Sequence, residues 1–224
     1  MLTEQEKAWQ NTFGIEYTNR NFLSLQGLED LYRNRFGISR SEMNLKFLKH
    51  LNRSLRILEV GCNIGNQLLC LKKMGFNNLT GIEIQPYAVQ VAKIRLKNIK
   101  IIQASISNLP FEAGFFDLVF TSGILIHINP VDIEKVLAEI YRCSHRYIWD
   151  LECFADEYEE IRYRGRKNLL WKTNFIRLWQ ESFPDLKLIK EKQFKYLDGS
   201  GNIDSMFLLE KTNPLKSSLE TKEL

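Results

Sequence analysis

The feature that most constrains the fold is a short apolar strand pattern at residues 55–60 that runs directly into a glycine-containing loop. The loop, residues 61–65, reads GCNIG, and a helical pattern begins at Asn66. A strand, a tight glycine turn and a helix form the first unit of a nucleotide-binding sheet, because glycine lets the backbone approach a ligand at the carboxyl end of the strand. An ordinary strand-to-helix turn also uses glycine and is the alternative interpretation.

Two acids favour the ligand-binding interpretation. Glu59 lies inside an otherwise apolar strand, where a carboxylate is costly unless it has a role. Glu83 ends the next predicted strand, where nucleotide-binding sheets place an acid against ribose hydroxyls. The NAD fingerprint GxGxxG does not fit, because Asn63 and Asn66 stand at two of its three glycine positions. The loop therefore indicates a nucleotide other than NAD.

Strand and helix patterns alternate along the rest of the chain, which predicts parallel pairing in an open, doubly wound α/β sheet. The expected strands are residues 55–60, 79–83, 99–103, 116–121, 146–151, 186–196 and 203–210. The expected helices are residues 22–36, 41–51, 66–74, 86–97, 131–142 and 173–182. Ser41 is the expected N-cap of the second of these helices. The DGSG turn at residues 198–201 predicts that the last two strands form an antiparallel hairpin.

The length of 224 residues suits one α/β domain, expected over residues 1–211. Its first forty residues predict a helical segment in which Trp9, Phe13 and Tyr17 recur every four positions on one face. Residues 212–224 are expected to form a flexible tail.

Composition narrows the functional classes. The net charge of +4, with no block of like charges, permits an anionic substrate without requiring a nucleic acid. The four scattered cysteines predict neither a metal site nor a disulfide framework. No apolar stretch approaches the ~18 residues of a membrane span, and the polar start lacks a signal-peptide pattern. A cytoplasmic protein is expected.

The loop carries a family resemblance. Glu59-x-Gly61-x-Asn63-x-Gly65 resembles the ExGxGxG signature of class I S-adenosyl-L-methionine-dependent methyltransferases, with Asn63 in place of the middle glycine. Asparagine tolerates positive φ better than most residues, so the departure is mild. The resemblance implies a Rossmann-like, seven-stranded sheet of order 3-2-1-4-5-7-6 whose last strand is antiparallel, with residues 1–40 as a helical lid. It also implies that S-adenosyl-L-methionine is the cofactor and that methyl transfer converts it to S-adenosyl-L-homocysteine.

The same resemblance assigns cofactor contacts. The glycine loop would lie under the amino-acid part of the cofactor, Glu83 would accept both ribose hydroxyls, and Ser105 would stand where many members have an Asp against the adenine amine. Leu109 and Phe111 either pack on that ring or belong to the core. The expected cofactor-binding residues are Tyr17, Arg20, Asn21, Glu59, Gly61, Cys62, Asn63, Gly65, Glu83, Ile84, Ser105, Ile106 and Thr121. Cys62 has no base near it in sequence and is interpreted as a small loop residue.

A narrower resemblance comes from three clusters. Residues 9–21, residues 120–130, and a third cluster are similar to methylases associated with pseudaminic acid biosynthesis. The third cluster combines residues 141–144, 161–166 and 183–186. This resemblance implies an acidic sugar or nucleotide-sugar acceptor. Arg166 stands where those methylases carry His, and residues 151–154 lack their aromatic-rich pattern, so the substrate face is expected to differ.

Two groups of residues are candidates for the acceptor side. His127 follows the fourth strand, where it would serve as a general base for a hydroxyl acceptor, orient another acceptor, or simply be a core residue. Arg162, Tyr163 and Arg164 predict anion binding, because a guanidinium bonds carboxylate and phosphate bidentately. If the segment is extended, Arg162 and Arg164 share one side. The alternative is ion pairing with the acidic residues 156–160.

No metal is expected. The alternatives to an acidic-sugar methyltransferase are a methyltransferase for another small metabolite or for RNA. A protein that binds the cofactor without catalysis is a third alternative.

Overall fold

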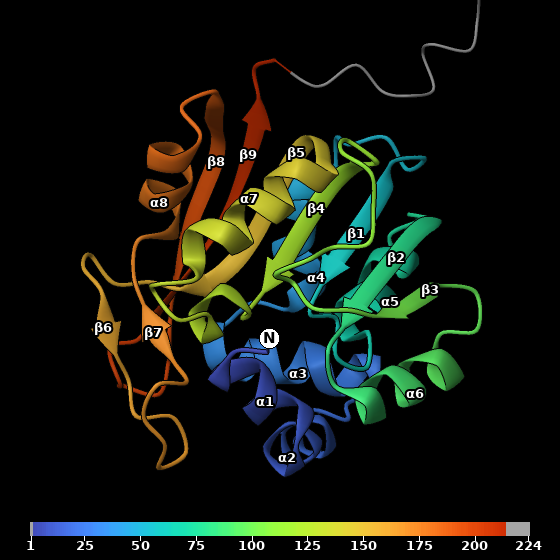
Figure 1. The fold of residues 1–224 in the computed structure, drawn as a ribbon. Coiled ribbons are helices and arrows are strands. Elements are labelled where there is room, and N and C mark those ends of the chain that lie inside the picture. The colour runs from blue at the N-terminus through green and yellow to red at the C-terminus, as the bar shows by residue number, and fades with distance from the viewer. Residues whose placement is uncertain (1, 214–224) are drawn as a thin grey trace, which may run out of the picture.

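A seven-stranded sheet forms the centre of the protein, and the structure, a computed structural model, describes residues 2–213 (Figure 1). Its strands, in spatial order, are β3 (Lys100–Gln103), β2 (Asn78–Glu83), β1 (Arg56–Val60), β4 (Phe116–Ser122), β5 (Ser144–Cys153), β9 (Ile203–Lys211) and β8 (Leu186–Lys195). The five from β3 to β5 pair in parallel, whereas β9 is antiparallel to both β5 and β8. The predicted order 3-2-1-4-5-7-6 is confirmed, since β9 and β8 are its seventh and sixth strands.

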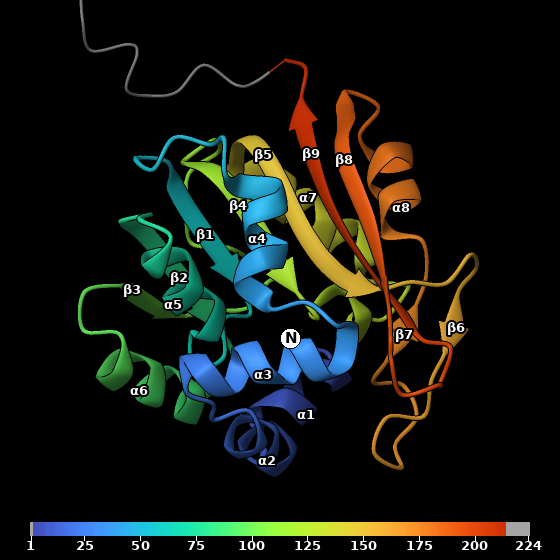
Figure 2. The same cartoon turned by 180° about the vertical axis from the view of Figure 1, so that it is seen from behind.

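Helices cover both faces of the sheet (Figures 1 and 2). One face buries side chains of α4 (Arg40–Leu48), α5 (Asn66–Lys73) and α6 (Pro86–Arg95), and the other buries those of α7 (Ile133–Cys143) and α8 (Phe175–Ser182). In α7, apolar residues follow the spacing i, i+3, i+4, i+7 and are almost fully buried: Ile133, Val136, Leu137 and Ile140. Burying each such side chain contributes about 1.5–3 kcal/mol, which holds the helix on the sheet.

Three N-terminal helices lie beneath the carboxyl ends of the parallel strands: α1 (Glu4–Gln10), α2 (Thr12–Arg20) and α3 (Leu25–Phe36) (Figure 1). The predicted aromatic face is present, because the ring of Trp9 lies 5.1 Å from those of both Phe13 and Tyr17. The chain is nevertheless extended at Asn11, which separates two helices. Gly14 allows this corner, since a Cβ there would lie 1.8 Å from the Trp9 carbonyl oxygen.

One predicted helix cap was wrong, and one short hairpin was missed. Helix α4 begins one residue earlier than expected, because its N-cap is Ser39, whose hydroxyl and the side chain of Glu42 form a capping box. Ser41 instead hydrogen-bonds the Glu29 carboxylate. The hairpin of β6 (Glu159–Glu160) and β7 (Trp171–Lys172) was not predicted, because two-residue strands are too short to leave a periodic pattern.

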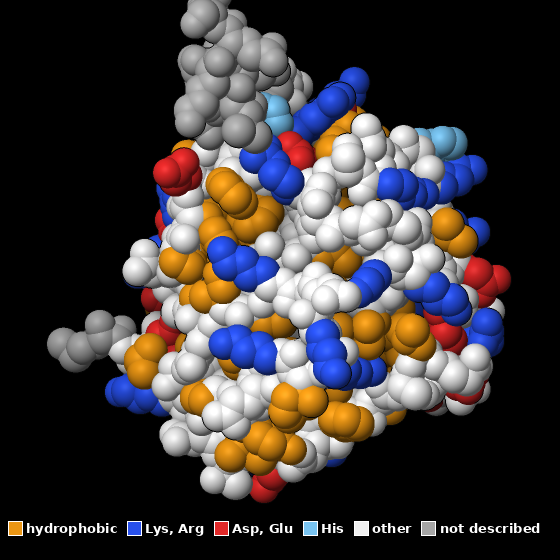
Figure 3. All heavy atoms as spheres, turned by 90° about the vertical axis from the view of Figure 1, so that its right-hand side faces the viewer, with side chains coloured by type: hydrophobic (Ala, Val, Ile, Leu, Met, Phe, Trp, Pro, Cys, Tyr) orange, Lys and Arg blue, Asp and Glu red, His pale blue; other side chains and the backbone are white. Residues whose placement is uncertain are grey.

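The charged surface, the character of the helices and the end of the described chain can be compared with what the composition predicts. Lys and Arg side chains are scattered among apolar ones on the face that includes β3 and α6 (Figure 3). Among the described helices, none has the length and apolar character needed to cross a bilayer. Thr212, where the predicted tail begins, bonds the Asp185 carbonyl through its N–H and its hydroxyl. Residues 214–224 of that tail lie outside the described part of the chain.

Candidate functional site

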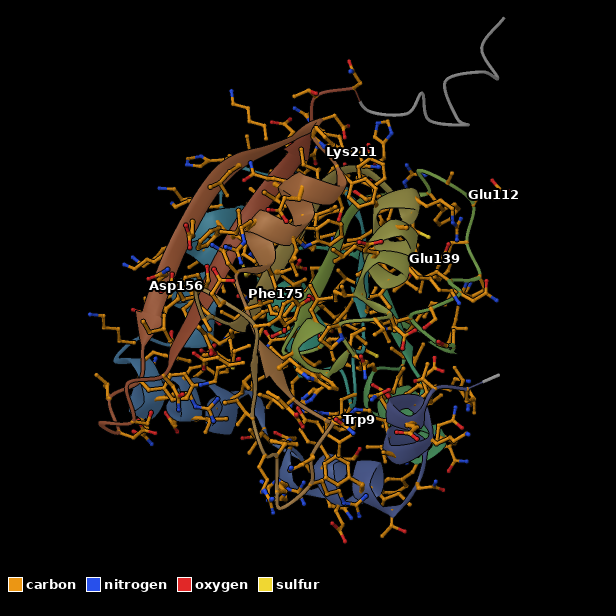
Figure 4. The ribbon with its side chains drawn as sticks, turned by 60° about the vertical axis from the view of Figure 1, so that its left-hand side comes forward. Trp9, Glu112, Glu139, Asp156, Phe175 and Lys211 are labelled. Atoms are coloured by element: carbon orange, nitrogen blue, oxygen red, sulfur yellow. The ribbon has the colours of Figure 1, made fainter. Side chains whose placement is uncertain are left out.

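A cavity of about 620 Å³ lies between the carboxyl ends of the strands and the three N-terminal helices. Trp9 occupies this region, between the helices and the sheet (Figure 4). Most of the predicted site residues line the cavity: Tyr17, Arg20, Asn21, Glu59, Gly61, Cys62, Asn63, Glu83, Ile84, Ile106, His127, Tyr163 and Arg164. Four others are not part of its lining: Gly65, Ser105, Thr121 and Arg162.

The glycine loop has the backbone that its sequence predicts. Gly61, Asn63 and Gly65 all have positive φ, of 73°, 46° and 76°. A Cβ on Gly65 would lie 2.1 Å from Leu96 Cδ1, so packing rather than ligand contact requires this glycine. Asn63 does more than tolerate the left-handed conformation. Its Nδ2 donates to the Thr18 hydroxyl at 3.0 Å and ties the loop to α2.

Glu83 is held in the cavity wall by backbone donors. Its two carboxylate oxygens accept the N–H groups of Asn63 and Gln85, each at 2.8 Å. Burial raises the pKa of this carboxyl, and the two N–H donors oppose that shift. Each oxygen keeps a lone pair for a further donor from the cavity.

Glu59 and Gln67 present acceptors without partners. Both residues are buried and line the cavity. Within the described chain, neither Glu59 Oε2 nor Gln67 Oε1 has a hydrogen-bond partner. Burial raises the pKa of Glu59 well above its usual range, although Arg40 opposes the shift. Buried acceptors without partners are costly, and a nearby positive charge favours the ionised carboxylate that burial disfavours. This wall therefore favours a ligand that brings N–H donors, above all a cationic one.

The loop after β3 corrects the expectation for Ser105. Its hydroxyl hydrogen-bonds the carboxylate of Glu6 in α1, and the hydroxyl of Ser107 lies 3.4 Å from the same carboxylate. Glu6, Ser107 and Ala104 line the cavity, whereas Leu109 belongs to the core and Phe111 packs against it. Glu6 was not among the predicted site residues, although it completes a recognisable capping box with Thr3.

Thr121 contacts the protein interior. Its hydroxyl lies 2.9 Å from Asp150 and 2.8 Å from Glu152. Glu152 also accepts the N–H groups of Ile124 and Ile126, at 3.0 and 3.3 Å, and so fixes the turn that carries His127. Burial raises the pKa of Asp150 to about 6 and that of Glu152 to about 8.

His127 lies in the short 3-10 helix η1 (Leu125–His127), with its ring centre 4.6 Å from that of Trp9 and 5.2 Å from that of Tyr163. Its Nδ1 lies 2.6 Å from the Leu169 carbonyl oxygen. A carbonyl only accepts, so Nδ1 carries the proton and Nε2 is left as an acceptor. Burial lowers the pKa of His127 to about 4. The imidazole is therefore neutral and better suited to accept a hydrogen bond than to retain a proton.

This burial predicts a pH-dependent stability. The unfolded chain takes up a proton on His127 near pH 6.5, whereas the folded chain resists until about pH 4, so stability falls as the pH drops between these values. Over this pH range the free energy of unfolding should fall by about 3 kcal/mol because of His127. In urea unfolding across this range, the wild type should lose about that much more stability than His127→Asn. Parallel curves for the two proteins would contradict the assignment.

The arginine-rich segment is a turn, so the expectation of an extended segment was wrong. Tyr163 and Arg166 exchange backbone hydrogen bonds around Arg164 and Gly165, whose φ angles are 49° and 78°. Tyr163 and Arg164 therefore face the cavity, while Arg162 is exposed outside it.

The predicted alternative, pairing of these arginines with residues 156–160, is also absent from the described chain. Glu157 pairs instead with Arg177 at 3.2 Å, and Glu160 accepts the N–H of Asn168. The charge of Arg164 therefore remains available to the cavity.

Comparisons with known proteins agree with this geometry. Residues 58–146 match the sequence profile of a family described as a methyltransferase domain. Over 132 residues the chain is 32% identical to the ribosomal protein L11 methyltransferase of Thermotoga neapolitana. The matched region covers 57% of this chain and 48% of that protein.

Two solved structures share the fold. One is the 1,6-didemethyltoxoflavin-N1-methyltransferase of Burkholderia thailandensis, with bound 1,6-didemethyltoxoflavin and S-adenosylhomocysteine. It has a TM-score of 0.68 and 15% identity, and the match covers 95% of this chain and 92% of that one. The geranyl diphosphate C-methyltransferase of Streptomyces coelicolor A3(2) also has a TM-score of 0.68, at 8% identity, and covers 93% of this chain and 98% of that one.

These neighbours have the Rossmann-like methyltransferase fold, with the same mixed seven-stranded sheet. The chain spans less than half the length of the curated relatives that it matches first, at 41%, 48% and 33% of their residues.

Proposed function

We propose that this chain is a class I S-adenosylmethionine-dependent methyltransferase that binds its cofactor in the cavity beneath the strand ends. The observation that carries the proposal is a pair of acceptors beside the glycine loop, Glu59 Oε2 and Gln67 Oε1, that have no hydrogen-bond partner within residues 2–213. Such acceptors fit the ammonium group of the amino-acid part of the cofactor. The methyltransferase-domain match over residues 58–146 supports the same assignment.

The remaining cofactor contacts follow from the cavity wall. Glu83 accepts the two ribose hydroxyls on its free lone pairs. Ile84 and Ile106 pack on the adenine ring, and Glu6 accepts from the adenine amine in place of the Asp that Ser105 replaces. Tyr17, Arg20 and Asn21 close over the amino-acid part.

The helices α1 and α2 act as a lid that excludes water from the site. Two of the contacts that hold them closed lie beside the glycine loop and Glu83. Asn63 bonds Thr18, and the Gln85 side chain donates to backbone carbonyls at the α1–α2 corner, with a distance of 3.0 Å to that of Gln10. Asn63 is part of the glycine loop, and the backbone N–H of Gln85 donates to the Glu83 carboxylate, so lid closure and cofactor binding are coupled.

When bound, S-adenosylmethionine supplies a methyl group on a positively charged sulfur, which is electrophilic without help from a metal. The chain then has to align the acceptor and exclude water, and alignment contributes up to ~7–11 kcal/mol in favourable cases. His127 orients the acceptor through Nε2, because its lowered pKa makes it a poor store for a proton.

The acceptor that we propose is a small anionic molecule. Tyr163 and Arg164 line the cavity beside His127, and the guanidinium of Arg164 has no acidic partner in the described residues. The resemblance to methylases associated with pseudaminic acid biosynthesis makes an acidic sugar or nucleotide-linked sugar the first candidate. Within the described residues the four cysteines are unpaired, which supports a reducing compartment such as the cytoplasm.

Methyl transfer itself is tested with a labelled cofactor. Incubating the protein with S-adenosylmethionine carrying a tritiated methyl group and the small-molecule fraction of a cell extract should label a product that binds an anion exchanger. Cofactor binding without any transfer would instead favour a non-catalytic cofactor-binding protein.

Arg164 offers a specific prediction in the same assay. Arg164→Ala should lower the labelling rate at limiting extract by about 10-fold, the cost of one charge-assisted hydrogen bond, while the affinity for S-adenosylhomocysteine holds. Arg162→Ala, two residues away but exposed outside the cavity, is the matched control and should label like the wild type. Equal rates for both variants would remove Arg164 from the acceptor site.

A further inference from the structure

One end of the cavity holds polar side chains that the proposed function does not use. This end lies between α3 and the lower ends of β5, β8 and β9, on the side that Figure 2 turns toward the viewer. Its residues are Tyr32, Arg35, Cys153, Tyr196 and Asp204. They come from segments far apart in the sequence, so no local pattern pointed to them.

Arg35 presents a positive charge without an acidic partner in residues 2–213. Its guanidinium carbon lies 5.2 Å from the centre of the Tyr196 ring and 5.9 Å from that of Phe36. These aromatic contacts hold the side chain in place without neutralising it. Arg33, on the same helix, differs because it is half-exposed and pairs with Asp30 at 3.3 Å.

Asp204 supplies the opposite character at the same end. Its carboxylate is buried, with 7% of the residue exposed, and accepts the Tyr196 hydroxyl at 3.1 Å. Burial raises the pKa of this carboxyl, while hydrogen bonds from Cys153 and Tyr196 and the charges of Arg35 and Arg40 oppose the shift. Arg35 and Asp204 nevertheless form no ion pair with each other in the described structure. Each is therefore available to a different part of one ligand.

We propose that Arg35, Tyr196 and Asp204 form a second acceptor-recognition subsite of this enzyme, separate from Tyr163 and Arg164. Arg35 takes a carboxylate or phosphate of the acceptor, and Asp204, oriented by Tyr196, takes a hydroxyl or amine of the same molecule. Ser122, Gly123 and Leu151 line the cavity at the ends of the intervening strands β4 and β5, so a ligand held at this end can extend along them toward the glycine loop. The inference rests on the proposed methyltransferase function and specifies the acceptor class that the site selects.

The test uses the full chain in the labelled-methyl assay, with the extract diluted in steps. Arg35→Gln keeps the stem of the side chain and removes its charge. At limiting extract it should label the anionic product about 10-fold or more slowly than the wild type, and the deficit should shrink as extract is added. The affinity for S-adenosylhomocysteine, measured by calorimetry, should not change. Arg33→Gln is the matched control and should label at the wild-type rate.

The outcomes separate this inference from the function on which it rests. If the wild type labels nothing, the proposed function fails and the subsite fails with it. If the wild type labels a product that is neutral or cationic, or if Arg35→Gln labels at the wild-type rate, the subsite is overturned while the methyltransferase function stands. Tyr196→Phe adds a further check, because losing the hydroxyl that orients Asp204 should also slow labelling at limiting extract.

Discussion

Replacing Glu83 with Ala should weaken the affinity for S-adenosylhomocysteine by about 10- to 150-fold. This corresponds to about 1.5–3 kcal/mol, the usual contribution of hydrogen bonds to a charged group. The substitution removes the acceptor for both ribose hydroxyls and also leaves the N–H groups of Asn63 and Gln85 without the carboxylate that now fixes the loop. Isothermal titration calorimetry on the purified variants measures the effect directly.

The matched control is Glu112→Ala, because Glu112 is an exposed acid on the loop between β3 and β4 that does not line the cavity (Figure 4). It should bind S-adenosylhomocysteine with wild-type affinity. Far-ultraviolet circular dichroism should show that both variants are folded. A folded Glu83→Ala protein with unchanged affinity would remove Glu83 from the cofactor site.

Replacing Glu152 with Ala should lower the free energy of unfolding by about 3 kcal/mol. The buried N–H groups of Ile124 and Ile126 would lose their acceptor, and the side chain would leave a cavity. Urea unfolding measures this loss. Glu157→Ala, which removes an exposed acid that pairs with Arg177, should stay within about 0.5 kcal/mol of the wild type.

The pH dependence of the free energy of unfolding tests the role of Glu152 in a second way. Burial raises the pKa of Glu152 to about 8, so the folded chain keeps this proton between pH 4.5 and 8 while the unfolded chain loses it. Stability from this group is therefore full below pH 4.5 and is lost as the pH rises toward 8. Glu152→Gln keeps an oxygen acceptor but does not titrate. At low pH this variant should be about as stable as the wild type. Between pH 4.5 and 8 its free energy of unfolding should fall less steeply than that of the wild type. An equally steep fall would contradict the assignment.

The sheet was predictable from the sequence because its order follows from local patterns. Alternating strands and helices impose parallel pairing, and the DGSG turn at residues 198–201 imposes the antiparallel end. The glycine loop and Glu83 were predictable for the same reason, since strand ends, turn glycines and a following acid are all close in sequence. Helix starts were less certain, because Ser39 and Ser41 both suit an N-cap and only the partner of each hydroxyl decides between them.

Contacts between distant segments were not predictable. Nothing local shows that Thr121 turns its hydroxyl toward Asp150 and Glu152, or that the Ser105 hydroxyl meets Glu6 across nearly a hundred residues. The assembly of Arg35 with the end of β8 and the start of β9 depends on how α3 crosses beneath the sheet. These tertiary contacts determine which polar residues reach the cavity and which are buried in the interior.

The measurement that tests the central claim most directly is calorimetric titration of the wild-type chain with S-adenosylhomocysteine and, separately, with NAD. The buried acceptors of Glu59 and Gln67, together with the failed NAD fingerprint, predict saturable binding of one S-adenosylhomocysteine per chain and no binding of NAD. Binding of NAD, or no binding of S-adenosylhomocysteine to the folded protein, would contradict the assignment of this cavity as a methyltransferase cofactor site.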